Sequence, residues 1–197
     1  MTADKRKSTD FRKWKPTRAL VLGAGPVGLL GTAILRLQGL EVDTAATRSV
    51  ESLKAKLVQS TGATYINSKE TPLHSFDGKY DIVFEVTGNP SVAVEAQDLI
   101  MVNGIVCYLG IYREDIETEN VGKIFTDLVL GNRLHFGSVN ANRTYFERGV
   151  KDLAKIQKRW PTFLSGIITR KEKLNTAALA YKPENEEEIK TVLEIAN

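Results

Sequence analysis

The chain contains one cysteine, Cys107, and only two histidines, His74 and His135. A single cysteine excludes a disulfide within the chain and is typical of a reducing compartment, so we expect a cytoplasmic protein. So few thiol and imidazole ligands argue against a metal site formed by these residues. The sequence also lacks an apolar run of 18 residues and an apolar N-terminal segment, so we expect neither a membrane span nor a signal peptide.

The chain also lacks a strong excess of either charge, because its formal net charge is +3. Basic residues concentrate at the start, and against Asp4 and Asp10 they give the first 18 residues a charge of +5, which leaves −2 for the rest. They are Lys5, Arg6, Lys7, Arg12, Lys13, Lys15 and Arg18. We interpret residues 1–17 as a basic linker or tail. The alternative, an arm that binds nucleic acid, is disfavoured because only Phe11 and Trp14 interleave the charges, so no nucleic-acid partner is expected.

A glycine triplet follows the first apolar run, residues 19–22. Gly23, Gly25 and Gly28 have G-x-G-x-x-G spacing, and the apolar residues after them recur at helical steps up to Leu37. The glycines therefore lie where a strand turns into a helix. There, the first permits a tight turn, the second a close approach of pyrophosphate and the third close helix packing. The pattern favours a dinucleotide site over an ordinary strand–helix turn.

The end of the second predicted strand, residues 41–45, bears on the choice of cofactor. An NAD site usually has an acidic residue there for the ribose 2′-hydroxyl. This chain has Ala46 followed by Thr47, Arg48 and Ser49, whereas Asp43 lies inside the strand. A guanidinium with neighbouring hydroxyls suits a 2′-phosphate, so we favour NADP and keep NAD as the alternative. The other interpretation of Arg48 is a surface residue at the start of a helix predicted over 49–59.

Strands and helices alternate through the first three quarters of the chain. Further strands are predicted at 63–66, 80–86, 104–109 and 134–139, with helices at 91–100, 121–130 and 144–158, and a loop at 111–120. This pattern predicts an α/β fold, a doubly wound Rossmann sheet of six parallel strands in the order 3-2-1-4-5-6. Ligands of such sheets bind at the carboxyl ends of the strands. That edge would carry Gly25, Arg48, Thr87, Gly110 and Val139.

The sequence divides into three predicted segments: the tail at 1–17, the Rossmann domain at 18–158 and a C-terminal segment at 159–197. In the last segment we expect a short strand at 166–169 without a clear partner and a final helix at 185–195. We interpret Asp81 and Glu85 as structural residues of a core strand, and His135 as a hydrogen-bonded strand histidine.

Four stretches resemble the cofactor half of medium-chain dehydrogenases/reductases, and most closely the archaeal-type NAD(P)-dependent glucose 1-dehydrogenases. They are ALVLGAGPVGLL at 19–30, EVTGNP at 85–90, VCYLG at 106–110 and NRLHFGSVNANRTYFERGV at 132–150. The first three are typical of the whole superfamily, and the fourth is more specific. FLSGIITRKEKL at 163–174 continues the match.

The resemblance implies a role for each matched residue. The turn of Gly23, Gly25, Pro26, Val27 and Gly28 would hold the pyrophosphate, and Thr47 and Arg48 would face the adenosine ribose and its 2′-phosphate. Thr87, Gly88 and Asn89 would line the ribose groove. Leu109, Gly110 and Val139 would contact the nicotinamide end, and Asn140 would lie beside an aldose substrate.

The resemblance also implies what these 197 residues leave out. In the family, the catalytic zinc ligands belong to an N-terminal segment, and a last strand follows the final helix; we expect neither here, whether the chain is an excised domain or a natural short protein. We therefore expect an NADP(H)-binding domain that is inactive alone and dimeric, with no catalytic residue of its own. The alternative is a stand-alone nucleotide sensor or partner-binding module. A flavoprotein and a methyltransferase fit less well, because each would want an acidic residue that is absent.

Overall fold

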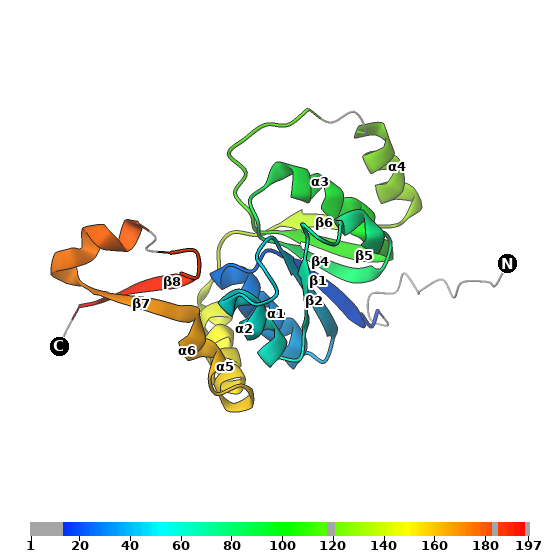
Figure 1. Cartoon of the computed structure of the whole chain (residues 1–197). Coiled ribbons are helices and arrows are strands. Elements are labelled where there is room, and N and C mark those ends of the chain that lie inside the picture. Colours follow the sequence, from blue (N-terminus) through cyan, green and yellow to red (C-terminus); the bar gives the residue numbers. More distant parts are fainter. Residues whose placement is uncertain (1–13, 118–120, 183–184, 196–197) are drawn as a thin grey trace.

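A computed structural model describes residues 14–117, 121–182 and 185–195 (Figure 1), so most of the predicted basic tail lies outside the described residues. Six parallel strands form one sheet in the order β3-β2-β1-β4-β5-β6. The strands are β1 (Arg18–Leu22), β2 (Glu41–Ala46), β3 (Thr64–Asn67), β4 (Tyr80–Glu85), β5 (Ile100–Tyr108) and β6 (Leu134–Gly137). This confirms the predicted Rossmann sheet and its strand order.

Helices cover both faces of this sheet (Figure 1). They are α1 (Pro26–Leu37), α2 (Leu53–Ser60), α3 (Pro90–Leu99), α4 (Val121–Leu130), α5 (Arg143–Arg159) and α6 (Phe163–Ile167), with a 3-10 turn, η1 (Leu73–Phe76). Residues alternate between the faces along β1, so Ala19 and Val21 belong to one core and Leu20 and Leu22 to the other. Two buried faces explain why this strand is a continuous apolar run.

Two carboxylates, the buried Asp81 and the partly buried Asp43, tie the central strands of the sheet together. Asp81 accepts hydrogen bonds from the backbone N–H groups of Thr17 at 2.8 Å and Arg18 at 3.0 Å. Asp43 accepts from the Tyr80 hydroxyl at 2.7 Å and from the Arg18 guanidinium at 3.2 Å. Burial and the Asp43 carboxylate raise the pKa of Tyr80 far above its ordinary value. These contacts agree with a structural role for Asp81 and keep Asp43 away from the strand's carboxyl end.

The predicted ends of three elements were wrong. The helix expected from Ser49 begins at Leu53, because the Ser52 hydroxyl accepts from the Ala55 N–H and caps the helix there. β5 begins at Ile100 rather than at 104, and it passes an irregularity where Asn103 has a φ of 61°. β6 ends at Gly137, so Val139 follows the strand instead of closing it.

The C-terminal predictions were right in part. A strand is present, β7 (Ile168–Lys173), although it begins two residues later than the predicted 166–169 and follows α6, which residues 163–167 form. Instead of a final helix at 185–195 there is a strand, β8 (Lys190–Glu194), which pairs in parallel with β7. Apolar residues at Val192 and Leu193 fit either periodicity over so short a segment. Pairing with a distant strand decides the conformation.

The two strands β7 and β8, with the intervening turns of η2 (Leu174–Tyr181), form what we call the C-terminal arm. It projects from the main body beside α5 and α6 (Figure 1). The helix that leads into it belongs to the main core, because Phe163 and Ile167 are buried there with α1 and α2. The proposed boundary at 158/159 stays a prediction.

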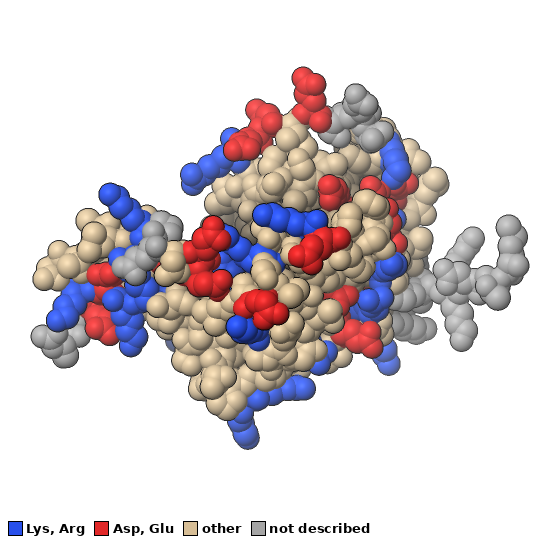
Figure 2. All heavy atoms as spheres, in the orientation of Figure 1, with Lys and Arg blue, Asp and Glu red and all other residues tan. Residues whose placement is uncertain are grey.

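Figure 2 shows acidic and basic side chains interspersed over the face of the molecule that it draws. In the described residues, no helix has the length and apolar character needed to cross a membrane.

Candidate cofactor site

The glycine turn joins β1 to α1 as the sequence predicts. Gly23 has a φ of +108°, a left-handed conformation that favours glycine, and its N–H donates to the Ala45 carbonyl at 2.8 Å. Gly25 is the N-cap of α1. The first N–H groups of a helix lack partners within it, and together with the helix dipole they favour an anion at this end.

The other two glycines differ in what surrounds them. A Cβ built on Gly28 would lie 1.9 Å from the Gly23 carbonyl oxygen, so this position admits only glycine. A Cβ on Gly25 would meet no atom within 4 Å. Gly28 therefore allows the turn to close, whereas Gly25 leaves bare backbone beside open space.

That open space belongs to a pocket of about 470 Å³ at the carboxyl ends of β1, β2 and β4. Seven of the predicted cofactor residues line it. They are Gly23, Gly25, Ala46, Thr47, Arg48, Thr87 and Asn89. The chain places β2 and β3 on one side of β1 and then β4, β5 and β6 on the other side, so the strand order reverses at β1. The pocket lies at this point of reversal, which is the usual ligand crevice of such folds.

Two polar residues of the pocket were missed by the sequence reasoning, Lys54 and Ser68. Lys54 lies in the first turn of α2, and Ser68 follows β3 directly, where its N–H donates to the Ala46 carbonyl at 2.9 Å. The rule that ligands bind beyond the carboxyl ends of strands could have identified Ser68. Lys54 gives the end of β2 a second cation beside Arg48.

A buried carboxylate organises the loop after β4. Glu85 accepts hydrogen bonds from the Thr87 N–H at 2.7 Å and from the hydroxyls of Thr87 and Tyr112. The Thr87 hydroxyl oxygen accepts from the Asn89 N–H at 3.0 Å, and Asn89 caps α3. Burial, followed by the bond to Glu85, raises the pKa of Tyr112 above its ordinary range. The structural role expected of Glu85 is thus to fix the loop that carries Thr87 and Asn89.

The remaining predicted residues do not line the pocket. Gly88 and Gly110 pack closely, since a Cβ on Gly110 would lie 2.7 Å from the Gly88 nitrogen, and the Leu109 N–H donates to the Glu85 carbonyl at 2.9 Å. Val139 is 85% exposed. The others are Pro26, Val27 and Gly28 in the first turn of α1, Ser49 after β2, and the exposed Asn140.

The histidines and the cysteine do not gather into a site. Among the described residues, no group of three or more His, Cys, Asp or Glu side chains could hold a metal ion. His135 lies in β6, but the expectation of a hydrogen-bonded histidine was wrong for its Nε2, which is buried and has no partner among the described residues. Burial lowers the pKa of His135 and raises that of the Cys107 thiol, so both groups favour their neutral forms.

Comparison with known proteins extends this picture to nearly the whole chain. A family model described as "Glucose dehydrogenase C-terminus" matches residues 2–195. The glucose 1-dehydrogenase of Methanocella arvoryzae is 43% identical over 187 residues, which cover 92% of this chain and 52% of that protein. Glucose 1-dehydrogenase 1 of Caldivirga maquilingensis is 42% identical over 93% of this chain and 51% of its own length. The chain spans about half the length of these relatives.

Solved structures agree with this match. Haloferax mediterranei glucose dehydrogenase, in complex with NADP, Zn and gluconolactone, superimposes with a TM-score of 0.85 at 27% identity, over 93% of this chain and 52% of that one. An alcohol dehydrogenase from Thermotoga maritima gives a TM-score of 0.74 at 26% identity. The resemblance seen in the sequence is therefore confirmed, and the chain belongs to the glucose dehydrogenase C-terminal family.

Proposed function

We propose that this chain is the NADP(H)-binding part of a glucose (aldose) 1-dehydrogenase-like oxidoreductase. One observation carries the proposal: the pocket combines the bare glycine turn with Arg48 at the end of β2, where an NAD site would usually have a carboxylate. The relative whose structure contains NADP supports it. The single cysteine supports a cytoplasmic location.

The residues of the pocket fit a dinucleotide. The open space beside Gly25 lets a pyrophosphate approach the first turn of α1, and Arg48 and Lys54 offer positive charge to a 2′-phosphate. Thr87 and Asn89 would line the ribose groove. Leu109, Gly110 and Val139 would face the nicotinamide, which accepts a hydride in such enzymes, and Asn140 would orient a sugar hydroxyl. The described residues do not fit a catalytic zinc, because they form no ligand cluster.

A second candidate function is a nucleotide-binding module without catalysis. The observation that favours this module is that the described residues form no cluster of metal ligands. The two functions share the pocket and differ only in whether a complementary polypeptide makes the chain active. The mixing experiment in the Discussion separates them.

Arg48→Ala is expected to weaken NADPH binding about 5- to 30-fold and to leave NADH binding within about twofold. The reason is the loss of one charge-assisted contact with the 2′-phosphate, about 1–2 kcal/mol at a partly exposed site. Calorimetric titration of both cofactors measures the effect. Arg143→Ala is the matched control, since Arg143 lies on the exposed side of α5 in an ion pair with Glu147. Equal loss for the two cofactors, or equal affinities in the unmodified chain, would contradict the proposed NADP preference.

We also expect the chain to form a homodimer in solution. β6 is an edge strand of the sheet with the half-exposed apolar residues Leu134 and Phe136, and on α4 Val129 and Leu130 are 77% and 78% exposed. An open strand edge beside apolar surface favours association.

Light scattering at micromolar to near-millimolar concentrations should therefore give the mass of a dimer. The double substitution Val129→Lys, Leu130→Lys should shift the equilibrium toward monomer. Leu174→Lys, at an apolar position in the C-terminal arm that is 59% exposed, should not. A monomer at every concentration would refute the expected dimer.

A further inference from the structure

The C-terminal arm brings a carboxylate to Arg48, a residue that lines the cofactor pocket. Glu186 forms an ion pair with the Nη1 of Arg48, although the two residues are 138 positions apart in the sequence. Their side chains are 80% and 39% exposed, so water reaches the pair. The guanidinium that we assign to a 2′-phosphate thus already has an anionic partner from the same chain.

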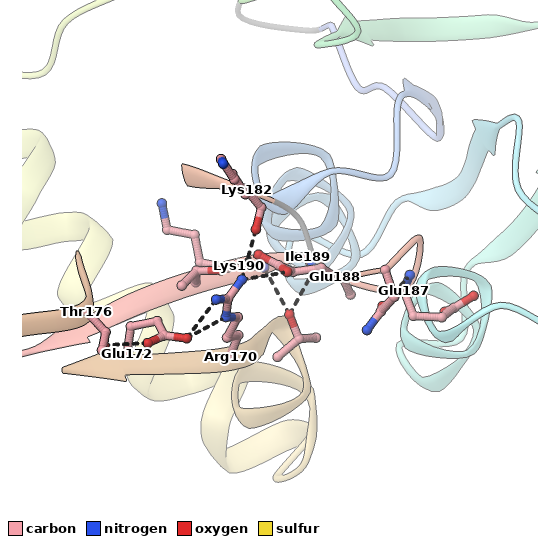
Figure 3. Close-up of polar contacts among 11 residues, drawn as sticks. Arg170, Glu172, Thr176, Lys182, Glu187, Glu188, Ile189 and Lys190 are labelled. Atoms are coloured by element: carbon pink, nitrogen blue, oxygen red, sulfur yellow. Dashed lines mark hydrogen bonds and ion pairs between the residues drawn. The ribbon is translucent and has the colours of Figure 1, made fainter. Parts of the chain in front are cut away.

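Figure 3 shows the polar contacts that hold the segment around residues 187–190 against β7. Arg170, whose side chain is only 9% exposed, lies between Glu172, bound at 2.7 and 2.8 Å, and Glu188, whose carboxylate lies 3.5 Å from Nη1. Its Nη1 also donates to the Lys182 carbonyl at 2.9 Å. The Arg170 side chain therefore links β7 to Lys182 and to Glu188.

Two further contacts fix the turn at 185–189. The Thr169 hydroxyl oxygen accepts hydrogen bonds from the Ile189 N–H at 2.9 Å and from the Lys190 N–H at 3.3 Å. The Glu187 carboxylate accepts from the Leu53 N–H, the first residue of α2, at 2.6 Å. We call residues 185–189 the acidic turn. It is anchored to β7 on one side and to the start of α2 on the other.

Arg48 is held from its own side as well. Its carbonyl accepts a hydrogen bond from the Tyr65 hydroxyl at 2.9 Å, which fixes the backbone of the loop between β2 and α2. Because both partners start from anchored backbone, the ion pair is formed between preorganised groups. Arg48 lines the pocket, whereas Glu186 is not among the lining residues and pairs with the guanidinium from outside it.

We propose that Glu186 is a specificity-determining residue, whose carboxylate competes with the 2′-phosphate of NADP(H) for Arg48. This inference rests on the proposed function. A 2′-phosphate must displace Glu186 and would otherwise be repelled by it, whereas a cofactor with a 2′-hydroxyl leaves the pair intact. The acidic turn therefore narrows the preference for NADPH that Arg48 creates.

Glu186→Gln tests this in the full chain. We expect NADPH to bind about threefold to tenfold more tightly, a range set by the loss of an exposed ion pair together with a like-charge repulsion, and NADH affinity to stay within about twofold. Glu194→Gln is the matched control, because Glu194 lies on the same arm but pairs with Lys171 at 3.5 Å. Unchanged NADPH affinity would overturn the proposal. So would weaker NADH binding, since it would make Glu186 a ribose ligand.

A readout without nucleotide keeps this inference separate from the proposed function. Modification of Arg48 by phenylglyoxal, followed by peptide mapping, should be several-fold faster in Glu186→Gln than in the unmodified chain or in Glu194→Gln. Equal rates would show that the pair does not form and would overturn the inference, even if NADPH binds. Faster modification without dinucleotide binding in any variant would overturn the proposed function, and the competition with it.

Discussion

Gly25→Val is expected to reduce dinucleotide affinity more than about 100-fold, about 2.7 kcal/mol, in a chain that remains folded. A Cβ at this position meets no protein atom within 4 Å, and the backbone φ of −77° suits any residue. A branched side chain would therefore be tolerated by the protein. It would instead occupy the space through which a pyrophosphate must approach the N-terminus of α1.

The measurement is a titration of NADPH and NADH, with circular dichroism and thermal unfolding as tests of the fold. Gly28→Ala provides the contrast, because its Cβ would lie 1.9 Å from the Gly23 carbonyl oxygen and should destabilise the domain itself. Gly25 is thus needed for ligand binding, and Gly28 is needed for the turn to close. Normal cofactor affinity in folded Gly25→Val would show that the phosphates bind elsewhere.

The second large effect concerns turnover: we expect no glucose dehydrogenase activity from this chain alone. Oxidation of a sugar carbon by hydride transfer requires a group that takes the hydroxyl proton and one that stabilises the developing alkoxide. In the described residues no cluster could hold a metal ion. His74 lies in η1 and His135 in β6, and Asn140 can orient a hydroxyl but cannot act as its base. Cofactor binding should therefore occur without catalysis.

The assay follows NADP reduction with glucose, galactose and xylose, with and without added zinc, and with Gly25→Val as the background control. It is then repeated after mixing with the separately expressed N-terminal half of a homologue. Activity that arises only on mixing would support the role of an enzyme part and disfavour a module without catalysis. Turnover by the chain alone, above the Gly25→Val background, would reveal a catalytic site that the present assignment lacks.

The sequence was sufficient for the sheet and for the glycine turn, because both depend on local patterns. An apolar run such as residues 19–22 signals a strand buried on two faces, and the spacing of Gly23, Gly25 and Gly28 predicts the turn that follows. The pocket then follows from topology. Residues at the carboxyl ends of neighbouring strands, such as Arg48 and Thr87, must meet at one edge of the sheet.

The C-terminal arm could not be predicted in the same way. The segment at 191–193 forms a strand because β7 pairs with it. The local sequence of neither segment identifies the other as its partner. The contact of Glu186 with Arg48 joins residues 138 positions apart and depends on how the arm lies against α2. From the sequence alone, the acidic run at 186–188 is expected to be solvated surface. Lys54 was missed for a related reason, since the predicted start of α2 was wrong.

The hydrogen bonds of Asp81 also bear on how the chain folds. This carboxylate joins the start of β1 to β4 across 64 residues, and β1 stays unpaired on that side until β4 arrives. By then β1, β2 and β3 can associate through short crossovers. Closing a loop of this length costs about 4 kcal/mol of chain entropy before the contacts across β1 and β4 repay it. We therefore expect folding to be limited by this closure, with the second half of the sheet assembling on β4 once it has docked.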